Sequence, residues 1–141
     1  MQERTTFDVR KLQDLTNDIP FAMFTTRTVD GSLRSRPMVA GASAFDGQLW
    51  FFTRSRSAVA QELDGDPHVN VTYVSAPEDR FVSVSGTATV VRDEQRAAAM
   101  WQSAFQVWFA GGPSDPDLSL IRIELTRVEY WDQQTGRMRA L

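Results

Sequence analysis

Hydrophobic and polar residues alternate along much of the chain, and this alternation predicts a fold built mainly from β-strands. In residues 68–74 and 81–91, apolar side chains occupy about every second position, and serine, threonine or asparagine fills most of the positions between them. A period of two is typical of a strand with one face in a core and the other in solvent. By this pattern, or by β-branched and aromatic content, the predicted strands are residues 21–29, 33–45, 49–53, 68–74, 81–91 and 118–132.

Turn and breaker residues indicate how these strands are connected. The Asp-Gly pairs at 30–31 and 46–47 tolerate positive φ and predict two tight hairpins. Pro37 donates no ladder hydrogen bond, so the strand 33–45 is expected at a sheet edge or at a bulge. Gly86, in the middle of another strand, predicts a bulge or a close approach of two backbones.

Apolar residues at helical spacing predict three helices between and around the strands. The predicted helices cover residues 6–19, 57–64 and 94–109. Ser57 and Asp93 are the expected N-caps of the second and third. The tail at 133–141 shows neither the period of two typical of a strand nor helical spacing, and we expect it to be frayed.

Six strands joined mostly by short turns favour a closed or nearly closed antiparallel barrel. The length of 141 residues suits one domain with one core, so the expected organisation is a single domain over residues 1–141. A six-stranded barrel is narrow and fills with side chains. A ligand is therefore expected on the outside of the barrel or at a subunit boundary.

Composition narrows the possible functions. The chain is 42% hydrophobic and 23% charged, as in globular proteins, and its net charge of −3 lacks the basic excess of nucleic-acid binders. The absence of cysteine excludes disulfides and thiol catalysis, and a single histidine, His68, argues against a metal site. The polar N-terminus predicts no signal peptide, and no apolar run approaches the roughly 18 residues of a membrane span. We expect a cytoplasmic protein that binds neither nucleic acid nor membrane.

The segment "WFFTRSRSAVAQEL" at 50–63 is the place where the sequence concentrates binding chemistry. Hydroxyl and guanidinium groups alternate directly before the predicted helix, at Thr53, Arg54, Ser55, Arg56 and Ser57. The free amide groups and the dipole at a helix start favour an anion. The alternative is that Ser57 only caps the helix and that the arginines are solvated.

Two further arginines favour the anion site. Arg34 and Arg36 lie two positions apart, so they share one face of the strand 33–45. The hairpin at 46–47 is expected to place this strand beside 49–53, which brings Arg36 toward the same anion. Aromatic side chains of the neighbouring strand add a flat apolar surface. The combination suits a phosphorylated, planar heterocycle.

Three motifs occur in order along the chain: "RPM" at 36–38, "LWFFT" at 49–53 before a serine-capped helix, and "SVSGTATVV" at 83–91 before another helix. With these motifs the sequence resembles the general stress protein branch of the pyridoxamine 5′-phosphate oxidase-like FMN-binding split barrels. The likeness extends from the first helix to "VEYWD". It implies a mainly β fold with flanking helices, a six-stranded antiparallel split β-barrel, and a homodimer with FMN at its interface.

The resemblance also implies a set of cofactor-binding residues. The FMN phosphate would be held by Arg36, Thr53, Arg56 and Ser57. The flavin ring would be lined by Met38, Val39, Phe51, Phe52 and, from the second subunit, Trp131. The other aromatic candidates are Trp101 and Trp108, and core or dimer packing is the alternative role of all three tryptophans. Family members commonly carry a lysine just after the capping serine, where this chain has Ala58 and Val59; Arg54 or Arg56 would replace its charge.

The expected function is therefore that of an FMN-dependent oxidoreductase of unknown substrate, linked to a stress response. No side chain stands out as an acid or a base, so no catalytic residue is assigned, which agrees with hydride transfer at flavin N5. Two alternatives remain: a flavin-binding carrier without turnover, and a split barrel that uses another cofactor, FAD or F420.

Overall fold

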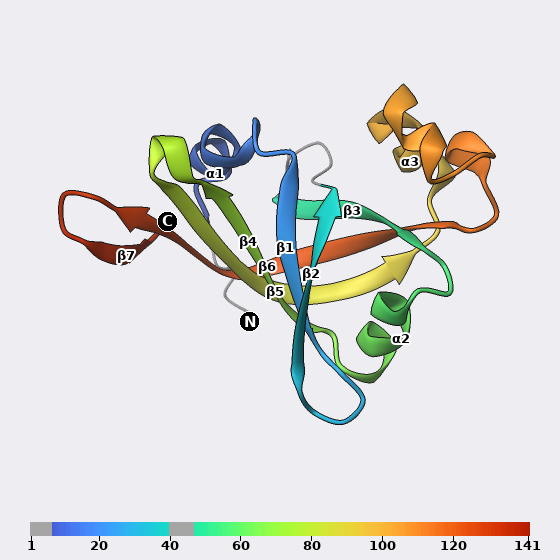
Figure 1. The fold of residues 1–141 in the computed structure, drawn as a ribbon, viewed down its shortest axis with the longest axis horizontal. Coiled ribbons are helices and arrows are strands. Elements are labelled where there is room, and N and C mark those ends of the chain that lie inside the picture. Colours follow the sequence, from blue (N-terminus) through green and yellow to red (C-terminus); the bar gives the residue numbers. More distant parts are fainter. Residues whose placement is uncertain (1–6, 40–46) are drawn as a thin grey trace, which may run out of the picture.

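The computed structural model describes residues 7–39 and 47–141, and Figure 1 shows a strongly curled sheet with short helices around it. The strands are β1 Phe21–Arg27, β2 Leu33–Val39, β3 Gln48–Arg54, β4 His68–Ser75, β5 Arg80–Val91, β6 Leu118–Asp132 and β7 Arg137–Ala140. The α-helices are α1 Val9–Thr16, α2 Ala58–Gly65 and α3 Glu94–Met100. The 3₁₀ turns are η1 Ala76–Glu78, η2 Ser103–Val107 and η3 Gly112–Ser114. Six long antiparallel strands confirm the predicted mainly β, split-barrel fold class.

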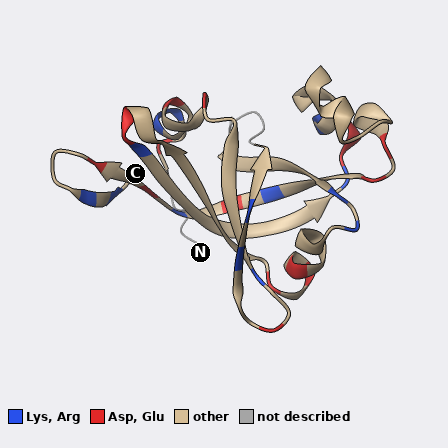
Figure 2. Cartoon of the chain, in the orientation of Figure 1, with Lys and Arg blue, Asp and Glu red and all other residues tan. Residues whose placement is uncertain are grey.

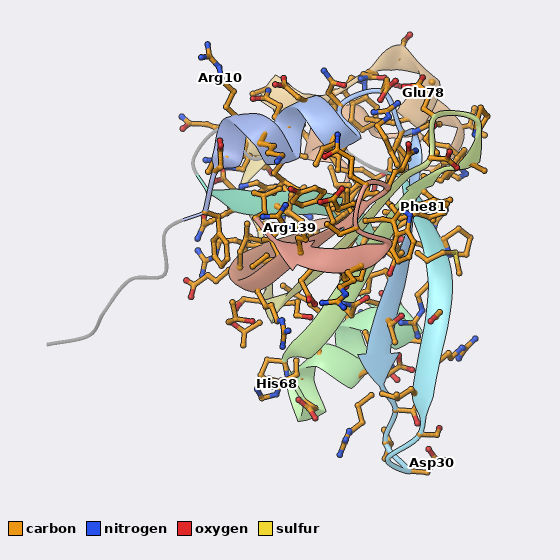
Figure 3. All side chains as sticks on the ribbon, turned by 90° about the vertical axis from the view of Figure 1, so that its left-hand side faces the viewer. Arg10, Asp30, His68, Glu78, Phe81 and Arg139 are labelled. Carbon is orange, nitrogen blue, oxygen red and sulfur yellow. The ribbon has the colours of Figure 1, made fainter. Side chains whose placement is uncertain are left out.

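The first hairpin has the turn that its Asp-Gly pair predicts. Gly31 has a φ of 86°, and the flanking strands pair in register from Arg27 with Leu33 to Phe21 with Val39. Figure 3 shows Asp30 at the tip of this hairpin. In the second Asp-Gly pair, Gly47 has the positive φ that was predicted, 83°, whereas Asp46 and the end of the predicted strand 33–45 lie outside the described residues.

The strand order explains why the barrel is split. The order is β2–β1–β4–β5–β6–β3, so β2 and β3 are its two ends. The sequence predicted that β2 and β3 pair side by side, but within the described residues β2 pairs with β1 and β3 pairs with β6. Curling of the sheet still brings parts of β2 within 8 Å of β3. Pro37 therefore lies on an edge strand, as predicted.

Both faces of β3 are buried, which is why its sequence is apolar without alternation. Phe51 points into the barrel core with residues such as Phe24 and Ile121. Phe52 points the other way, into a second cluster with Phe105 and residues of α3. Each fully buried side chain of this size contributes roughly 1.5–3 kcal/mol. The second cluster attaches the α3–η2 segment to the outside of the barrel.

Two predictions for the second half of the chain are wrong in detail. The predicted helix 94–109 ends at Met100, because Trp101 is extended (ψ 136°), and the chain then turns through η2. Trp101 packs edge-on against Phe52 in this conformation, with the ring centroids 6.1 Å apart. The predicted frayed tail instead contains β7, which pairs with β6 through a turn that has Gly136 at a φ of 65°.

The structure confirms the bulge and the close backbone approach predicted at Gly86. The register between β5 and β6 shifts at Ser85/Gly86, and the Gly86 backbone lies against the backbone of Glu124. The first and second helices also form where they are predicted, with Asp8 and Ser57 as N-caps, although residue 6 lies outside the described residues. Both helices bury apolar residues in the barrel core, Leu12 in α1 and Leu63 in α2.

Candidate functional site

A hollow of about 360 Å³ opens where the ends of β2 and β3 meet the start of α2 and the η2 segment. Its lining residues are Pro37, Met38, Val39, Phe52, Thr53, Arg54, Ser57, Val59, Phe105, Trp108 and Phe109. The volume falls in the range of small-molecule sites, roughly 300–1,000 Å³. The hollow lies on the outside of the barrel, as the narrow barrel interior requires.

One end of the hollow is polar, because two hydroxyl groups and a helix start meet there. The Thr53 and Ser57 hydroxyls are 3.0 Å apart. The Ser57 hydroxyl also accepts a hydrogen bond of 3.1 Å from the Ala60 amide and so caps α2. Among the described residues, no acceptor takes the amides of Ala58 and Val59 in the first turn. Free amides and the positive end of the helix dipole favour an anion at this point.

Part of the wall of the hollow is aromatic. The Phe52 ring lies 5.0 Å from Phe105 and 6.4 Å from Phe109, measured between ring centroids. The Trp108 ring is tilted against Phe105 at 6.2 Å, and Trp108 is 44% exposed. Flat apolar side chains that are partly open to solvent are suited to contact with a planar ring.

The two arginines of the loop before α2 have different surroundings. The Arg54 guanidinium forms an ion pair of 3.0 Å with Asp117, donates to the Trp108 carbonyl at 2.9 Å and lies over the Phe109 ring. Its charge is therefore largely balanced. Arg56 is exposed and has no hydrogen bond or ion pair with any residue that the structure describes. Arg56 is thus the arginine of this loop that is able to turn toward an anion.

Arg36 is not among the residues that line the hollow, and it binds a carboxylate of α2. Its Nη2 atom donates to Glu62 Oε1 at 2.6 Å, and its Nη1 atom donates to the Thr26 hydroxyl at 2.6 Å. Thr26 itself donates to the same carboxylate oxygen at 2.6 Å. Burial raises the pKa of Glu62, but the hydrogen bonds from Thr26 and Arg36 outweigh burial and leave the pKa below its ordinary value.

The structure brings together some of the predicted site residues and separates others. Those that line the hollow are Met38, Val39, Phe52, Thr53 and Ser57. Phe51 points into the barrel core, where it packs edge-on against Phe24. Trp131 lies on the part of β6 that pairs with β7 and is not among the residues that line the hollow of the same chain; in Figure 1, β7 lies at the opposite end of the molecule from α3.

Residues that the sequence did not assign to the site also contribute. Phe105 and Phe109 occupy core positions of the predicted helix, and their spacing alone does not distinguish a wall from a core. The buried position of Glu62 could have been predicted from the sequence. It is a charged residue next to Leu63 on the apolar side of α2, and such a residue needs a buried partner.

Another polar cluster, Asp66 and His68, helps to line a separate hollow of about 420 Å³, whose described lining includes no phenylalanine, tyrosine or tryptophan. His68 is exposed at the start of β4 (Figure 3), and its Nδ1 atom lies 2.8 Å from Asp66. Across residues 7–39 and 47–141, no three His, Cys, Asp or Glu side chains gather as a metal site, and no helix is long and apolar enough to span a membrane. Figure 2 shows basic and acidic residues scattered over the surface.

Comparison with known proteins identifies relatives over almost the whole chain. Residues 8–141 match the family described as "Pyridoxamine 5'-phosphate oxidase like". The chain is 31% identical over 134 residues to the protein named bli-3 of Neurospora crassa. The alignment covers 86% of this chain and 64% of that protein. The chain thus spans somewhat less than two thirds of the length of this curated relative.

Solved structures agree on the fold. The general stress FMN/FAD binding protein of Xanthomonas citri superposes with a TM-score of 0.73 at 28% identity, covering 87% of each chain. General Stress Protein 26 of Bacillus anthracis superposes with a TM-score of 0.79 at 19% identity, covering 94% of this chain and 97% of that one. At that identity the second likeness establishes the fold alone.

Proposed function

Because this chain belongs to the pyridoxamine 5'-phosphate oxidase like family, we propose that it binds a flavin, FMN, in the hollow between β2, β3, α2 and η2. One observation carries the proposal: the lining of the hollow combines hydroxyl groups at the start of α2 with several aromatic side chains. FMN carries groups that suit both, a phosphate and a flat ring. The similar protein from Xanthomonas citri is described as a general stress FMN/FAD binding protein.

The residues present fit this cofactor. The Thr53 and Ser57 hydroxyls and the first-turn amides of α2 would hold the phosphate, with Arg56 as the mobile positive charge in place of a lysine. Met38, Val39 and Phe52 would contact the ring. Arg54, held by Asp117, would fix the loop.

We propose that the bound flavin serves an oxidoreductase of the general stress group. The flavin supplies the hydride- or electron-transfer chemistry when it is bound. The chain's own residues bind and orient it and shield one side from water. No histidine or carboxylate is among the described residues that line the hollow, so the protein adds no acid or base there.

That same absence of an acid or a base favours a second candidate, a flavin carrier without turnover. FAD and F420 are the alternative cofactors, since each also places a phosphate beside an extended ring system.

We further propose that the protein is a cytoplasmic homodimer whose subunits are single domains over residues 1–141. Trp131 and Met138 are partly exposed neighbours on β6 and β7, 38% and 41% exposed. In a dimer, this pair would reach the hollow of the partner subunit. The molar mass in light scattering checks the dimer, and Trp131→Ala should then weaken flavin binding.

Titration of the purified protein with FMN, FAD, riboflavin and F420 tests the cofactor. FMN should bind most tightly, and riboflavin, which has the same ring without a phosphate, should bind more weakly. Absence of binding by any flavin would refute the proposal. Anaerobic addition of NADH or NADPH then separates the two functions, because an oxidoreductase reduces its bound flavin and a carrier does not.

A further inference from the structure

The position of α2 determines the polar end of the hollow. Ser57 caps this helix and Val59 lies in its first turn, and both line the hollow. The eight residues of α2 span only about 12 Å, so the helix moves as one short rod. Any contact that fixes α2 therefore also fixes the Ser57 hydroxyl and the free amides beside it.

Apolar packing alone gives α2 little directional constraint. Val59 and Leu63 are buried in the barrel core, but hydrophobic contact is not directional. Glu62 supplies the directional contact. It is only 7% exposed, and its Oε1 atom accepts two hydrogen bonds of 2.6 Å, one from Thr26 of β1 and one from Arg36 of β2. These bonds join the helix to both strands of the first hairpin.

Arg36 is fully engaged within the protein and is not among the residues that line the hollow. Besides Glu62 and Thr26, its guanidinium lies 3.4 Å from the Arg34 carbonyl and 3.5 Å from the Phe24 carbonyl. Met38, two residues further along β2, does line the hollow. The strand thus presents a wall residue to the hollow and a cation to α2. Removing Arg36 from Glu62 would leave a buried carboxylate without its charge partner, which is strongly unfavourable.

We propose that Arg36, Glu62 and Thr26 are positioning residues for the cofactor: together they lock α2 against the β1–β2 hairpin and so hold the phosphate-binding end of the hollow in place. This inference rests on the proposed flavin-binding function. It differs from the role that the family resemblance implies for Arg36, which is direct contact with the phosphate.

Glu62→Gln distinguishes the two roles by the sign of its effect. If the ion pair positions α2, the variant should bind FMN about tenfold more weakly, the size expected for one member of a coupled network. The affinity for riboflavin, which lacks the phosphate, should fall less. If Arg36 instead binds the phosphate directly, the loss of its competitor Glu62 should tighten FMN binding. Unchanged or tighter binding would therefore overturn the proposal.

A double-mutant cycle strengthens this test. Arg36→Met and Glu62→Gln should each weaken FMN binding, and the double variant should be little worse than either, because both remove one interaction. The matched controls are Arg34→Met, on the same face of β2, and Asp64→Asn, which is exposed on α2. Additive losses would contradict a shared role. Thr26→Val provides a milder variant if the others fold poorly.

Hydrogen exchange separates this inference from the proposed function. Without any flavin, the amides of Ala58–Gly65 should exchange faster in Glu62→Gln than in wild type or Asp64→Asn, because the helix has lost its tether. Equal exchange would overturn the positioning role whatever the ligand. If wild type binds no flavin, the proposed function fails, and the exchange experiment still decides whether the ion pair fixes α2.

Discussion

Arg54 of β3 and Asp117, just before β6, form an ion pair of 3.0 Å at the rim of the hollow. The same guanidinium holds the Trp108 carbonyl at 2.9 Å, so it ties the loop before α2 to the segment that carries the aromatic wall. Arg56, two positions later, has no such partner among the described residues. The two arginines of the "TRSRS" loop therefore have different expected roles.

Arg56→Gln should weaken FMN binding by about five- to tenfold, as expected for loss of a charged hydrogen bond at an open site. Riboflavin affinity and the melting temperature should change little, because Arg56 is exposed. The effect should shrink in high salt, which screens an exposed charge. Arg54→Gln is the matched comparison. It removes an exposed ion pair, so we expect a loss of stability of about 0.2–1 kcal/mol and a smaller phosphate-dependent effect.

Ser57→Asp separates the cap of α2 from the anion site. Aspartate caps a helix about as well as serine, so the free energy of unfolding should stay close to wild type. A second negative charge beside the phosphate should nevertheless reduce FMN affinity by more than tenfold and riboflavin affinity far less. Ser57→Ala should instead cost about 1 kcal/mol of stability through the lost cap. Equal losses of FMN and riboflavin affinity in Ser57→Asp would place the phosphate elsewhere.

Acid should weaken the contacts of Glu62 with Arg36 and Thr26, because protonation removes the charge of the carboxylate. Burial raises the pKa of Glu62, but hydrogen bonds from Thr26 and Arg36 hold it below its ordinary value of 4.5. A carboxyl group whose pKa is lower in the folded than in the unfolded state contributes stability. That stability is fully present above the unfolded pKa and is lost as the pH falls through the folded pKa. Urea unfolding from pH 7 to 3 should therefore show a stability gap between wild type and Glu62→Gln that narrows below about pH 4.5.

Asp64→Asn is the matched control variant, because Asp64 lies on the same helix and is exposed. A gap between wild type and Glu62→Gln that is constant with pH would show that the carboxylate does not titrate as the geometry requires.

Gly86→Ala should destabilise the barrel by about 2–4 kcal/mol, because any Cβ atom at this position meets the Glu124 backbone and lies 2.9 Å from the Ile123 side chain. Chemical unfolding measures the loss. Gly65→Ala is the control, since nothing lies within 4 Å of a Cβ there. We expect that control to be neutral or slightly stabilising. A neutral Gly86→Ala would mean that β5 and β6 separate easily.

Strands β4 and β5 were predictable because their residues alternate, the pairing of β1 with β2 from its Asp-Gly turn, and the edge position of β2 from Pro37. The partner of β3 was not predictable. The prediction placed β2 beside β3, the neighbour in sequence, whereas β3 pairs with β6. Pairing depends on the packing of both faces of β3, which local periodicity does not encode. The helix break at Trp101 likewise follows from its tertiary contact with Phe52.

The sequence predicted several residues that the structure brings together at the hollow, but not the whole of its lining. Hydroxyls before a helix cap identified Thr53 and Ser57, because the chemistry of a helix start is local. Arg36 was predicted to face the anion, but its partner Glu62 comes from a different element, and this pairing depends on the position of α2. The role of Trp131 depends on a second subunit, so one chain leaves it a prediction.

The pairing of β3 with β6 has a consequence for the order of folding. Phe52 and Thr53 are made early, yet their ladder partners among the described residues, Leu120 and Ser119, lie in the last third of the chain. Distant pairings form late because long loops must close first. During synthesis, β1, β2 and β4 have neighbours available while β3 waits for β6 to leave the ribosome. The hollow is therefore among the last parts of the molecule to be completed, and a flavin is expected to bind the finished barrel rather than to template it.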